Sequence, residues 1–264
     1  MTADYEKKIH MKIVAIIPAR LASTRFPRKV LLSIHGLPMI EHVRRRALLC
    51  KVFSDVYVAT CDKEISDVVQ GFGGKVILTS DKHINGTTRT AEAVEHIDCT
   101  HVMLLQGDEP LLLPRHLEVL ASAVTGDPSV NAWNITGPID HYKELDRHSF
   151  VKCAVSPSKH ILYCFRRSPC YSDFETQKTF VQKLLGILAY RKEFLLKLTT
   201  LQPSLIEQAE SIEQMRIIEN GFSLRSVFVA PSLPSINEPH EVEVALDLLE
   251  QDAEQSELLK RISV

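Results

Sequence analysis

Apolar and polar residues alternate along the first half of the chain in blocks that predict strands and helices in turn. Short runs rich in apolar or β-branched residues predict buried strands at residues 13–17, 55–60, 75–79 and 101–106. Helical spacing of apolar positions, with turn residues at the ends, predicts helices at residues 37–50, from Asp62 or Asp67 to Gly71, 87–97 and 114–124. This strand–helix rhythm predicts a mainly parallel sheet covered by helices on both faces.

The second half of the chain is less regular. Strands are predicted at residues 130–135, 185–190 and 224–230, and a hairpin at residues 151–155 and 160–165 around Ser156-Pro157-Ser158. Helices are predicted at residues 194–199, 206–220 and 238–251. We expect a single domain at residues 12–252 after an extension of residues 1–11, with an antiparallel lobe inserted at about residues 135–190.

Composition narrows the class of protein. The chain has 264 residues, a formal net charge of −2 and 24% charged residues, which excludes a bulk nucleic-acid binder. No apolar run approaches the roughly 18 residues of a membrane span, and the first ten residues lack the apolar core of a signal peptide. The six cysteines form no C-x-x-C pair. We expect a cytoplasmic protein with reduced thiols.

A basic loop follows the first predicted strand. It begins at Pro18 and carries Arg20, Arg25, Arg28 and Lys29. Loops at the carboxyl ends of parallel strands are where open α/β sheets bind ligands, and arginine binds phosphate through its bidentate fork. The loop therefore indicates a phosphate-binding site, with a solvated basic turn as the alternative.

An acidic pair follows the fourth predicted strand, in Gln106-Gly107-Asp108-Glu109-Pro110. Magnesium takes one or two carboxylates together with substrate phosphates, and Gly107 would let the backbone approach a ligand. The alternative is an ordinary turn in which Asp108 caps the next element.

Small polar residues follow the third predicted strand, in His83-Ile84-Asn85-Gly86-Thr87-Thr88-Arg89. A helix N-terminus of this kind suits a base or a phosphate, although Asn-Gly is also a common turn and Thr87 could be an N-cap. On the predicted helix 206–220, steps of three place Glu207, Glu210 and Glu213 near one face, for which a solvated surface is the better interpretation.

Taken in order, these motifs resemble those of the 3-deoxy-manno-octulosonate cytidylyltransferases, also called CMP-Kdo synthetases. The family pattern is P-A-R-x-x-S-(S/T)-R-x-P-x-K, then G-T-x-R, then Q-G-D-E-P. The matching residues here are Pro18-Ala19-Arg20, Ser23-Thr24-Arg25, Pro27, Lys29, Gly86-Thr87, Arg89 and Gln106 to Pro110. Further likeness covers roughly residues 12–250 and includes Val151-Lys152, Tyr163, Arg166 and Glu213-Gln214-Met215-Arg216.

The resemblance implies a Rossmann-like α/β fold of the nucleotide-diphospho-sugar transferase type, with a mixed, mainly parallel sheet and an inserted antiparallel lobe. It implies a Mg²⁺-dependent transfer of CMP from CTP to the anomeric hydroxyl of Kdo, with release of pyrophosphate, for lipopolysaccharide synthesis. It also implies a homodimer. Such a transfer needs positioning and charge neutralisation rather than an enzyme nucleophile.

The resemblance also implies roles for individual residues. Arg20 and Lys29 would hold the triphosphate and, with Asp108, form the catalytic set. The nucleotide site would comprise Pro18, Ala19, Arg20, Ser23, Arg25, Lys29, His83, Asn85, Gly86, Thr87, Gln106 and Gly107. Candidates for the sugar pocket are Arg166, Tyr190, Glu210 and Gln214, and those for Mg²⁺ are Asp108 and Asn237.

Five positions depart from the family pattern: Arg28 replaces a glycine, Cys61 an aspartate, Phe165 a serine, Leu184 a histidine and Asn237 a metal-binding carboxylate. Several of these lie where the sugar is expected to bind. Two alternatives therefore remain: a cytidylyltransferase for a related sugar acid, such as an amino-Kdo or a nonulosonate, and a catalytically weakened nucleotide-binding paralogue.

Overall fold

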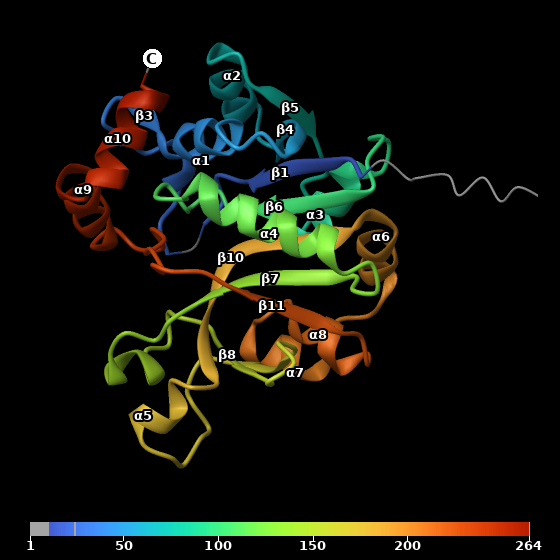
Figure 1. Ribbon diagram of the computed structural model, residues 1–264. Helices are drawn as coiled ribbons and strands as arrows, with labels where there is room; N and C mark the ends of the chain where they lie inside the picture. Colours follow the sequence, from blue (N-terminus) through green and yellow to red (C-terminus); the bar gives the residue numbers. More distant parts are fainter. Residues whose placement is uncertain (1–10, 24, 264) are drawn as a thin grey trace, which may run out of the picture.

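A large mixed sheet runs through the molecule (Figure 1). The computed structural model describes residues 11–23 and 25–263, and the expected extension of residues 1–11 lies almost entirely outside them. In this described part the sheet has nine strands: β1 (Ile13–Ala19), β4 (Phe53–Thr60), β5 (Lys75–Leu78), β6 (His101–Leu105), β7 (Ala132–Gly137), β8 (Lys152–Val155), β9 (Ile161–Phe165), β10 (Val181–Arg191) and β11 (Leu224–Phe228).

The main path of the sheet has the order β11-β7-β10-β6-β1-β4-β5. Along it β1 is parallel to β4 and β6, β4 to β5, and β11 to β7, whereas β10 is antiparallel to both of its neighbours. Six of these seven strands therefore point the same way, and the predicted mainly parallel sheet is confirmed. The predicted hairpin is also confirmed, since β8 pairs antiparallel with β9 and joins the sheet through β10.

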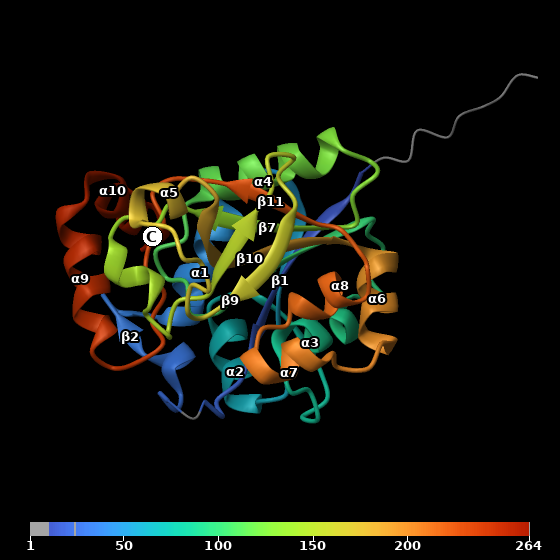
Figure 2. The ribbon, with the colours of Figure 1, turned by 90° about the horizontal axis from the view of Figure 1, so that it is seen from below.

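Helices cover both faces of the sheet (Figure 2). Those of the main layers are α1 (Met39–Leu48), α2 (Lys63–Gly71), α3 (Gly86–Val94), α4 (Pro114–Gly126), α6 (Lys192–Thr200), α7 (Leu205–Glu210) and α8 (Met215–Glu219). Alternate residues of β1 enter two different cores: Ala15 and Ile17 pack with α1, α2 and α4, whereas Val14 and Ile16 pack with α3, α6 and α8. This two-sided burial explains why the first apolar run is continuous.

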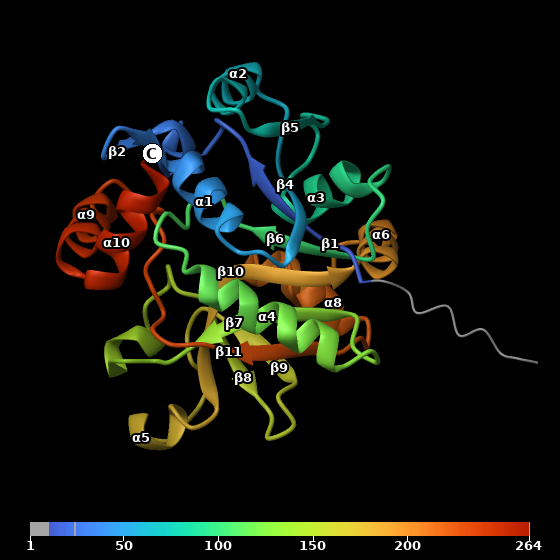
Figure 3. The same ribbon diagram turned by 45° about the horizontal axis from the view of Figure 1, so that its top comes forward.

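Several elements differ from the sequence predictions. The single helix expected at residues 206–220 is wrong, because the chain forms α7 and α8 with a break at Ser211, where φ is 54°. The chain also continues beyond residue 252, from α9 (Glu241–Gln251) into α10 (Ala253–Ile262), which pack beside α1 (Figure 3). A short hairpin of β2 (Ser33–Ile34) and β3 (Leu37–Pro38) precedes α1, with the helical turns η1 (Lys29–Leu31) before it and η2 (Tyr142–Leu145) after β7.

The segment between β7 and β10 forms the part of the molecule that carries β8, β9 and the short helix α5 (Phe174–Gln177) (Figure 1). It has a small apolar cluster of its own, made by Ile139, Leu145, Phe165 and Val181. Its role as an inserted lobe of a single domain stays a proposal.

Candidate active site

Two cavities open at the carboxyl ends of the parallel strands. The first, here called the loop cavity, has a volume of about 420 Å³. Its lining includes thirteen of the predicted residues: Pro18, Ala19, Arg20, Ser23, Arg25, Lys29, His83, Asn85, Gly86, Gln106, Gly107, Asp108 and Asn237. The loops after β1, β5 and β6 and the segment before α9 thus converge there, as expected for the crevice at the end of an open sheet.

The second cavity, here called the lobe cavity, has a volume of about 540 Å³ and lies between the sheet and the inserted segment. Thr87, Arg166 and Gln214 line it, together with Glu109, Lys183 and Leu184. Six residues line both cavities: Arg25, Gln106, Asp108, Ser211, Glu213 and Asn237. The two cavities therefore share a rim at the end of β6.

Two backbone hydrogen bonds hold the basic loop, one to Asp62 at the start of α2 and one between two residues of the loop itself. The backbone N–H of Leu21 donates to Asp62 Oδ2 at 2.8 Å, and the N–H of Arg28 donates to the carbonyl oxygen of Leu21 at 3.0 Å. Arg28 has a φ of 62° and its side chain pairs with Glu64, so it does not line the loop cavity. This left-handed backbone explains why a glycine would suit position 28, since glycine adopts it without steric cost.

Lys29 connects the loop after β6, which carries Asp108, with the segment before α9, which carries Ile236. Its Nζ lies 2.5 Å from Asp108 Oδ2 and 3.1 Å from the carbonyl oxygen of Ile236, and the N–H of Ile236 donates to the carbonyl oxygen of Asp108 at 2.9 Å. Lys29 and Asp108 are mostly buried, with 12% and 20% of their side chains exposed. This arrangement holds a cation and a carboxylate side by side at the point where the cavities meet.

The N-terminus of α3 forms another wall of the loop cavity. Asn85 is the N-cap, since its Oδ1 accepts from the N–H of Thr88 at 2.9 Å, so the alternative that Thr87 is the cap is wrong. A Cβ at Gly86 would lie 3.1 Å from Pro18 Cγ, which shows how closely α3 approaches β1. His83 is held by Glu92, whose carboxylate also accepts from the N–H of Ser80.

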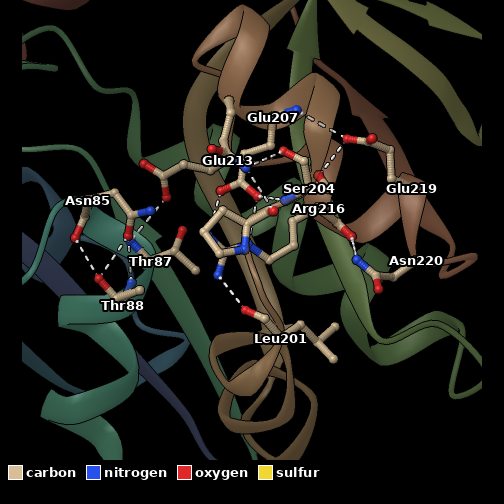
Figure 4. A network of polar contacts seen from close by, with 12 residues as sticks. Asn85, Thr87, Thr88, Leu201, Ser204, Glu207, Glu213, Arg216, Glu219 and Asn220 are labelled. Atoms are coloured by element: carbon tan, nitrogen blue, oxygen red, sulfur yellow. Dashed lines mark hydrogen bonds and ion pairs between the residues drawn. The ribbon is translucent and has the colours of Figure 1, made fainter.

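Glu213 reaches the shared rim because the chain breaks at Ser211. Its Oε2 accepts from the N–H of Thr87 at 3.3 Å (Figure 4). Burial raises the pKa of both Glu213 and Tyr190. Glu213 is therefore part of the site, and the interpretation of these glutamates as one solvated helix face is wrong.

Glu207 is internal as well. It forms a bidentate ion pair with Arg216, with Nη2–Oε1 and Nε–Oε2 distances of 2.6 and 2.8 Å, and both side chains are buried (Figure 4). This pair links α7 to α8 across the break and fixes the segment that carries Glu213.

The four candidates for the sugar pocket separate in the structure. Arg166 and Gln214 line the lobe cavity. Tyr190 is buried behind Thr87 and lines neither cavity, and Glu210 lines a neighbouring surface hollow. Gln214 donates from Nε2 to Asn134 Oδ1 at 3.0 Å.

Glu109 and Gly186 belong to the lobe cavity, although the sequence patterns singled out neither of them alone. Glu109 Oε1 accepts from the N–H of Gly186 at 3.2 Å, and a Cβ at Gly186 would lie only 2.6 Å from that oxygen. Burial and the adjacent Asp108 charge raise the pKa of Glu109 to about 8. The sequence does hold one clue to this contact: a glycine inside a predicted strand, here Gly186, often marks a place where another group approaches the backbone closely.

The other departures fall into two groups. Leu184 lines the lobe cavity, whereas Phe165 is 2% exposed and packs in the apolar cluster of the inserted segment. Cys61 Sγ lies 3.5 Å from Arg89 Nη2, and the next residue, Asp62, accepts from the N–H of Leu21 in the basic loop. Only Leu184 among these three changes the surface of a cavity.

The shared rim offers few ligands for a metal. No group of three His, Cys, Asp or Glu side chains that could hold a metal ion occurs among the described residues. Asp108 presents one oxygen besides the one near Lys29, and the Asn237 amide oxygen faces Arg25 Nη2 at 3.4 Å. One carboxylate and one amide fit Mg²⁺ that arrives with substrate phosphates.

Comparison with known proteins agrees with this geometry. A family model described as Cytidylyltransferase matches residues 14–227. The 3-deoxy-manno-octulosonate cytidylyltransferase of Escherichia coli is 38% identical over 241 residues, which cover 91% of this chain and 97% of that protein. The 8-amino-3,8-dideoxy-manno-octulosonate cytidylyltransferase of Shewanella piezotolerans is 35% identical over 238 residues, covering 89% and 97%.

A solved structure gives the same answer. That of CMP:2-keto-3-deoxy-manno-octonic acid synthetase complexed with CTP matches with a TM-score of 0.85 and 37% identity, covering 91% of this chain and 99% of that one. The chain is therefore a nucleotidyltransferase and belongs to the 3-deoxy-manno-octulosonate cytidylyltransferase family.

Proposed function

We propose that this protein transfers CMP from CTP to Kdo and releases pyrophosphate. The observation that carries the proposal is the shared rim, where a basic cavity suited to a triphosphate meets a second cavity large enough for a sugar acid. A transfer between two substrates needs both to lie against one reacting centre, and Asp108 lies in the wall common to both cavities.

In this mechanism the anomeric hydroxyl of the sugar acid attacks the α-phosphorus in line. A new P–O bond forms on one side of that phosphorus, and the bond to the pyrophosphate oxygen breaks on the other. The hydroxyl proton leaves to solvent. Arg20, Arg25 and Lys29 line the loop cavity and neutralise the charge that develops on the leaving pyrophosphate.

Magnesium belongs to the same proposal. Asp108 and Asn237 would hold it, and when bound it would supply charge neutralisation between the phosphate oxygens. The loop cavity residues orient the triphosphate, and Arg166 and Gln214 orient the sugar acid in the lobe cavity. Tyr190 lines neither cavity, so it would act on this site only indirectly.

The amino-sugar substrate named for the Shewanella relative is a second candidate acceptor. Leu184 is the reason to test it, because this residue changes the wall of the lobe cavity from the family pattern. A pyrophosphate-release assay with CTP and both sugar acids decides between them. No release with either acid would favour the weakened nucleotide-binding paralogue.

The pathway that uses the product, the oligomeric state and the cellular location are also proposed from the family. It includes use of the product in lipopolysaccharide synthesis, a homodimer formed through the inserted segment and a cytoplasmic location. In the described residues the six cysteines are free, and no helix there is long and apolar enough to span a membrane.

We expect CTP to bind far more tightly than ATP. The polar side chains of His83, Asn85 and Gln106 line the loop cavity, and they would read the edge of the base. At a concentration a hundred times its dissociation constant, CTP should raise the melting temperature by roughly 5–10 °C. Thermal shifts measured at equal concentrations of CTP and ATP check this, and equal shifts would contradict it.

Asn237→Asp should tighten Mg²⁺ binding. The variant gives the predicted metal position a second carboxylate in addition to Asp108, so the Mg²⁺ concentration for half-maximal velocity should fall by about tenfold. A Mg²⁺ titration of pyrophosphate release measures it, with Asn131→Asp, outside both cavities, as the control. An unchanged titration would move the metal towards Glu238 or Glu241 instead.

A further inference from the structure

A lysine ammonium lies inside the inserted segment, against the lobe cavity. Lys152, on β8, has 0% of its surface exposed. Its Nζ donates to the carbonyl oxygen of Arg147 at 2.9 Å and to the carbonyl oxygen of Arg166. Asp146 and Glu144 act on it only as longer-range charges.

An ammonium in such a place is unfavourable for folding by itself. Burial lowers the pKa of Lys152 to about 8, so the side chain is still charged at neutral pH. Carbonyl dipoles replace its water only in part, and an apolar residue would fill the same space without that desolvation cost. The charge therefore calls for a role other than stabilising β8.

The two carbonyl groups bound by Lys152 belong to two walls of the lobe cavity. Arg147 begins the loop that contains Ser149, Phe150 and Val151, which line the cavity. Arg166 lines it from the end of β9. Lys152 thus ties the backbone of one wall to the backbone of the other.

Arg166 extends the same connection to a third wall. Its guanidinium donates to the carbonyl oxygens of His148 at 3.0 Å, Glu210 at 2.8 Å and Ser211 at 3.2 Å. Glu210 and Ser211 lie at the break between α7 and α8, and Ser211 is two residues before Glu213. Two cations and five carbonyl groups therefore connect three of the segments that line the lobe cavity.

We propose that Lys152 is a positioning residue for the acceptor substrate, which acts by fixing the backbone of Arg166 and of the loop 147–151. The inference rests on the proposed function, because it assigns the lobe cavity to the sugar acid. The nucleotide should be unaffected, since Lys152 and its two partners are not in the wall of the loop cavity.

Lys152→Met tests this with the KM of each substrate measured separately. We expect the KM for Kdo to rise by about tenfold or more, because small displacements of positioning groups are costly, while the KM for CTP stays within about twofold. Lys192→Met is the matched control: Lys192 also donates to two carbonyl groups, of Glu95 and Ile97, but lies outside both cavities. It should leave both KM values unchanged.

A double-variant cycle tests whether Lys152 acts through Arg166. Arg166→Met should raise the KM for Kdo, and adding Lys152→Met should raise it little further, because the first change already removes the group that Lys152 positions. Lys152→Gln, which keeps two donor hydrogens on a shorter side chain, should show an intermediate KM, and it carries the test if the methionine variant does not fold.

The outcomes separate the two proposals. An inactive wild-type protein would overturn both. An active wild-type protein whose Lys152 variants raise the KM for CTP and for Kdo equally, or lower only the melting temperature, would overturn the positioning role alone.

Discussion

Replacing Asp108 with asparagine should abolish pyrophosphate release. Among the described residues, two carboxylates line the shared rim, Asp108 and Glu213. We place the metal at Asp108, because Glu213 accepts from the N–H of Thr87 and burial raises its pKa, which disfavours the charged form. The variant leaves no charged ligand at the predicted metal position. We expect kcat to fall by at least about a hundred- to a thousandfold.

The same variant should keep its affinity for CTP when metal is removed. Asparagine is close in shape to aspartate, and Lys29 loses a partner and becomes freer to pair with phosphate. Thermal shifts with CTP in the presence of a chelator, set beside the rate of pyrophosphate release, separate catalysis from binding. Asp67→Asn, at an exposed ion pair with Lys63, is the control. Full activity of Asp108→Asn would show that the metal is held elsewhere.

The strands and loops of the site were predictable because their signals are local. The run at 13–17 is apolar at every position, and the structure shows why: successive residues of β1 enter opposite cores. The basic loop and the acidic pair follow directly from strand ends. Topology alone then brings them together, because the carboxyl ends of parallel strands share one edge of the sheet.

The break at Ser211 was not predictable from spacing. Glutamates in steps of three favour a helix, and nothing local forbids one at residues 206–220. The determinants are distant in sequence: Arg166 binds the carbonyl groups of Glu210 and Ser211, and Arg216 pairs with Glu207 across the break. Tertiary contacts of this kind override helix propensity. They redirect the chain at Ser211, so that Glu213 faces the shared rim.

Two further differences have other causes. Helix α10 does have a local signal, since Asp252 caps it through the N–H of Gln255, but it begins only two residues after α9 ends. Tyr190 was placed in the sugar pocket from the resemblance, whereas the antiparallel pairing of β10 puts it in the core beside Thr87.

Lys29→Ala should weaken the use of CTP by roughly ten- to a hundredfold in kcat/KM. Losing one charge-assisted contact with phosphate costs about 1.5–3 kcal/mol. Arg20→Ala should act in the same direction, since Arg20 is an exposed cation in the wall of the same cavity. Steady-state kinetics with varied CTP measure both, and circular dichroism checks that the fold is kept.

Arg28→Ala is the matched control for the loop. Arg28 is adjacent to Lys29 and carries the same charge, but its side chain pairs with Glu64 outside the loop cavity. The variant should keep kcat/KM for CTP within about twofold, because an exposed ion pair contributes little. Equal losses in the Arg28 and Lys29 variants would mean that the loop acts only through its general positive charge.

The double variant Lys29→Ala/Asp108→Asn shows which of two functions Lys29 performs. If Lys29 only neutralised Asp108, removing both charges would restore the metal-free affinity for CTP. We expect no such recovery, because Lys29 lines the loop cavity and its Nζ is held there also by the carbonyl group of Ile236, independently of Asp108. Metal-free CTP affinity in the double variant should therefore remain close to that of Lys29→Ala alone, and a return to the wild-type value would assign Lys29 to Asp108 rather than to phosphate.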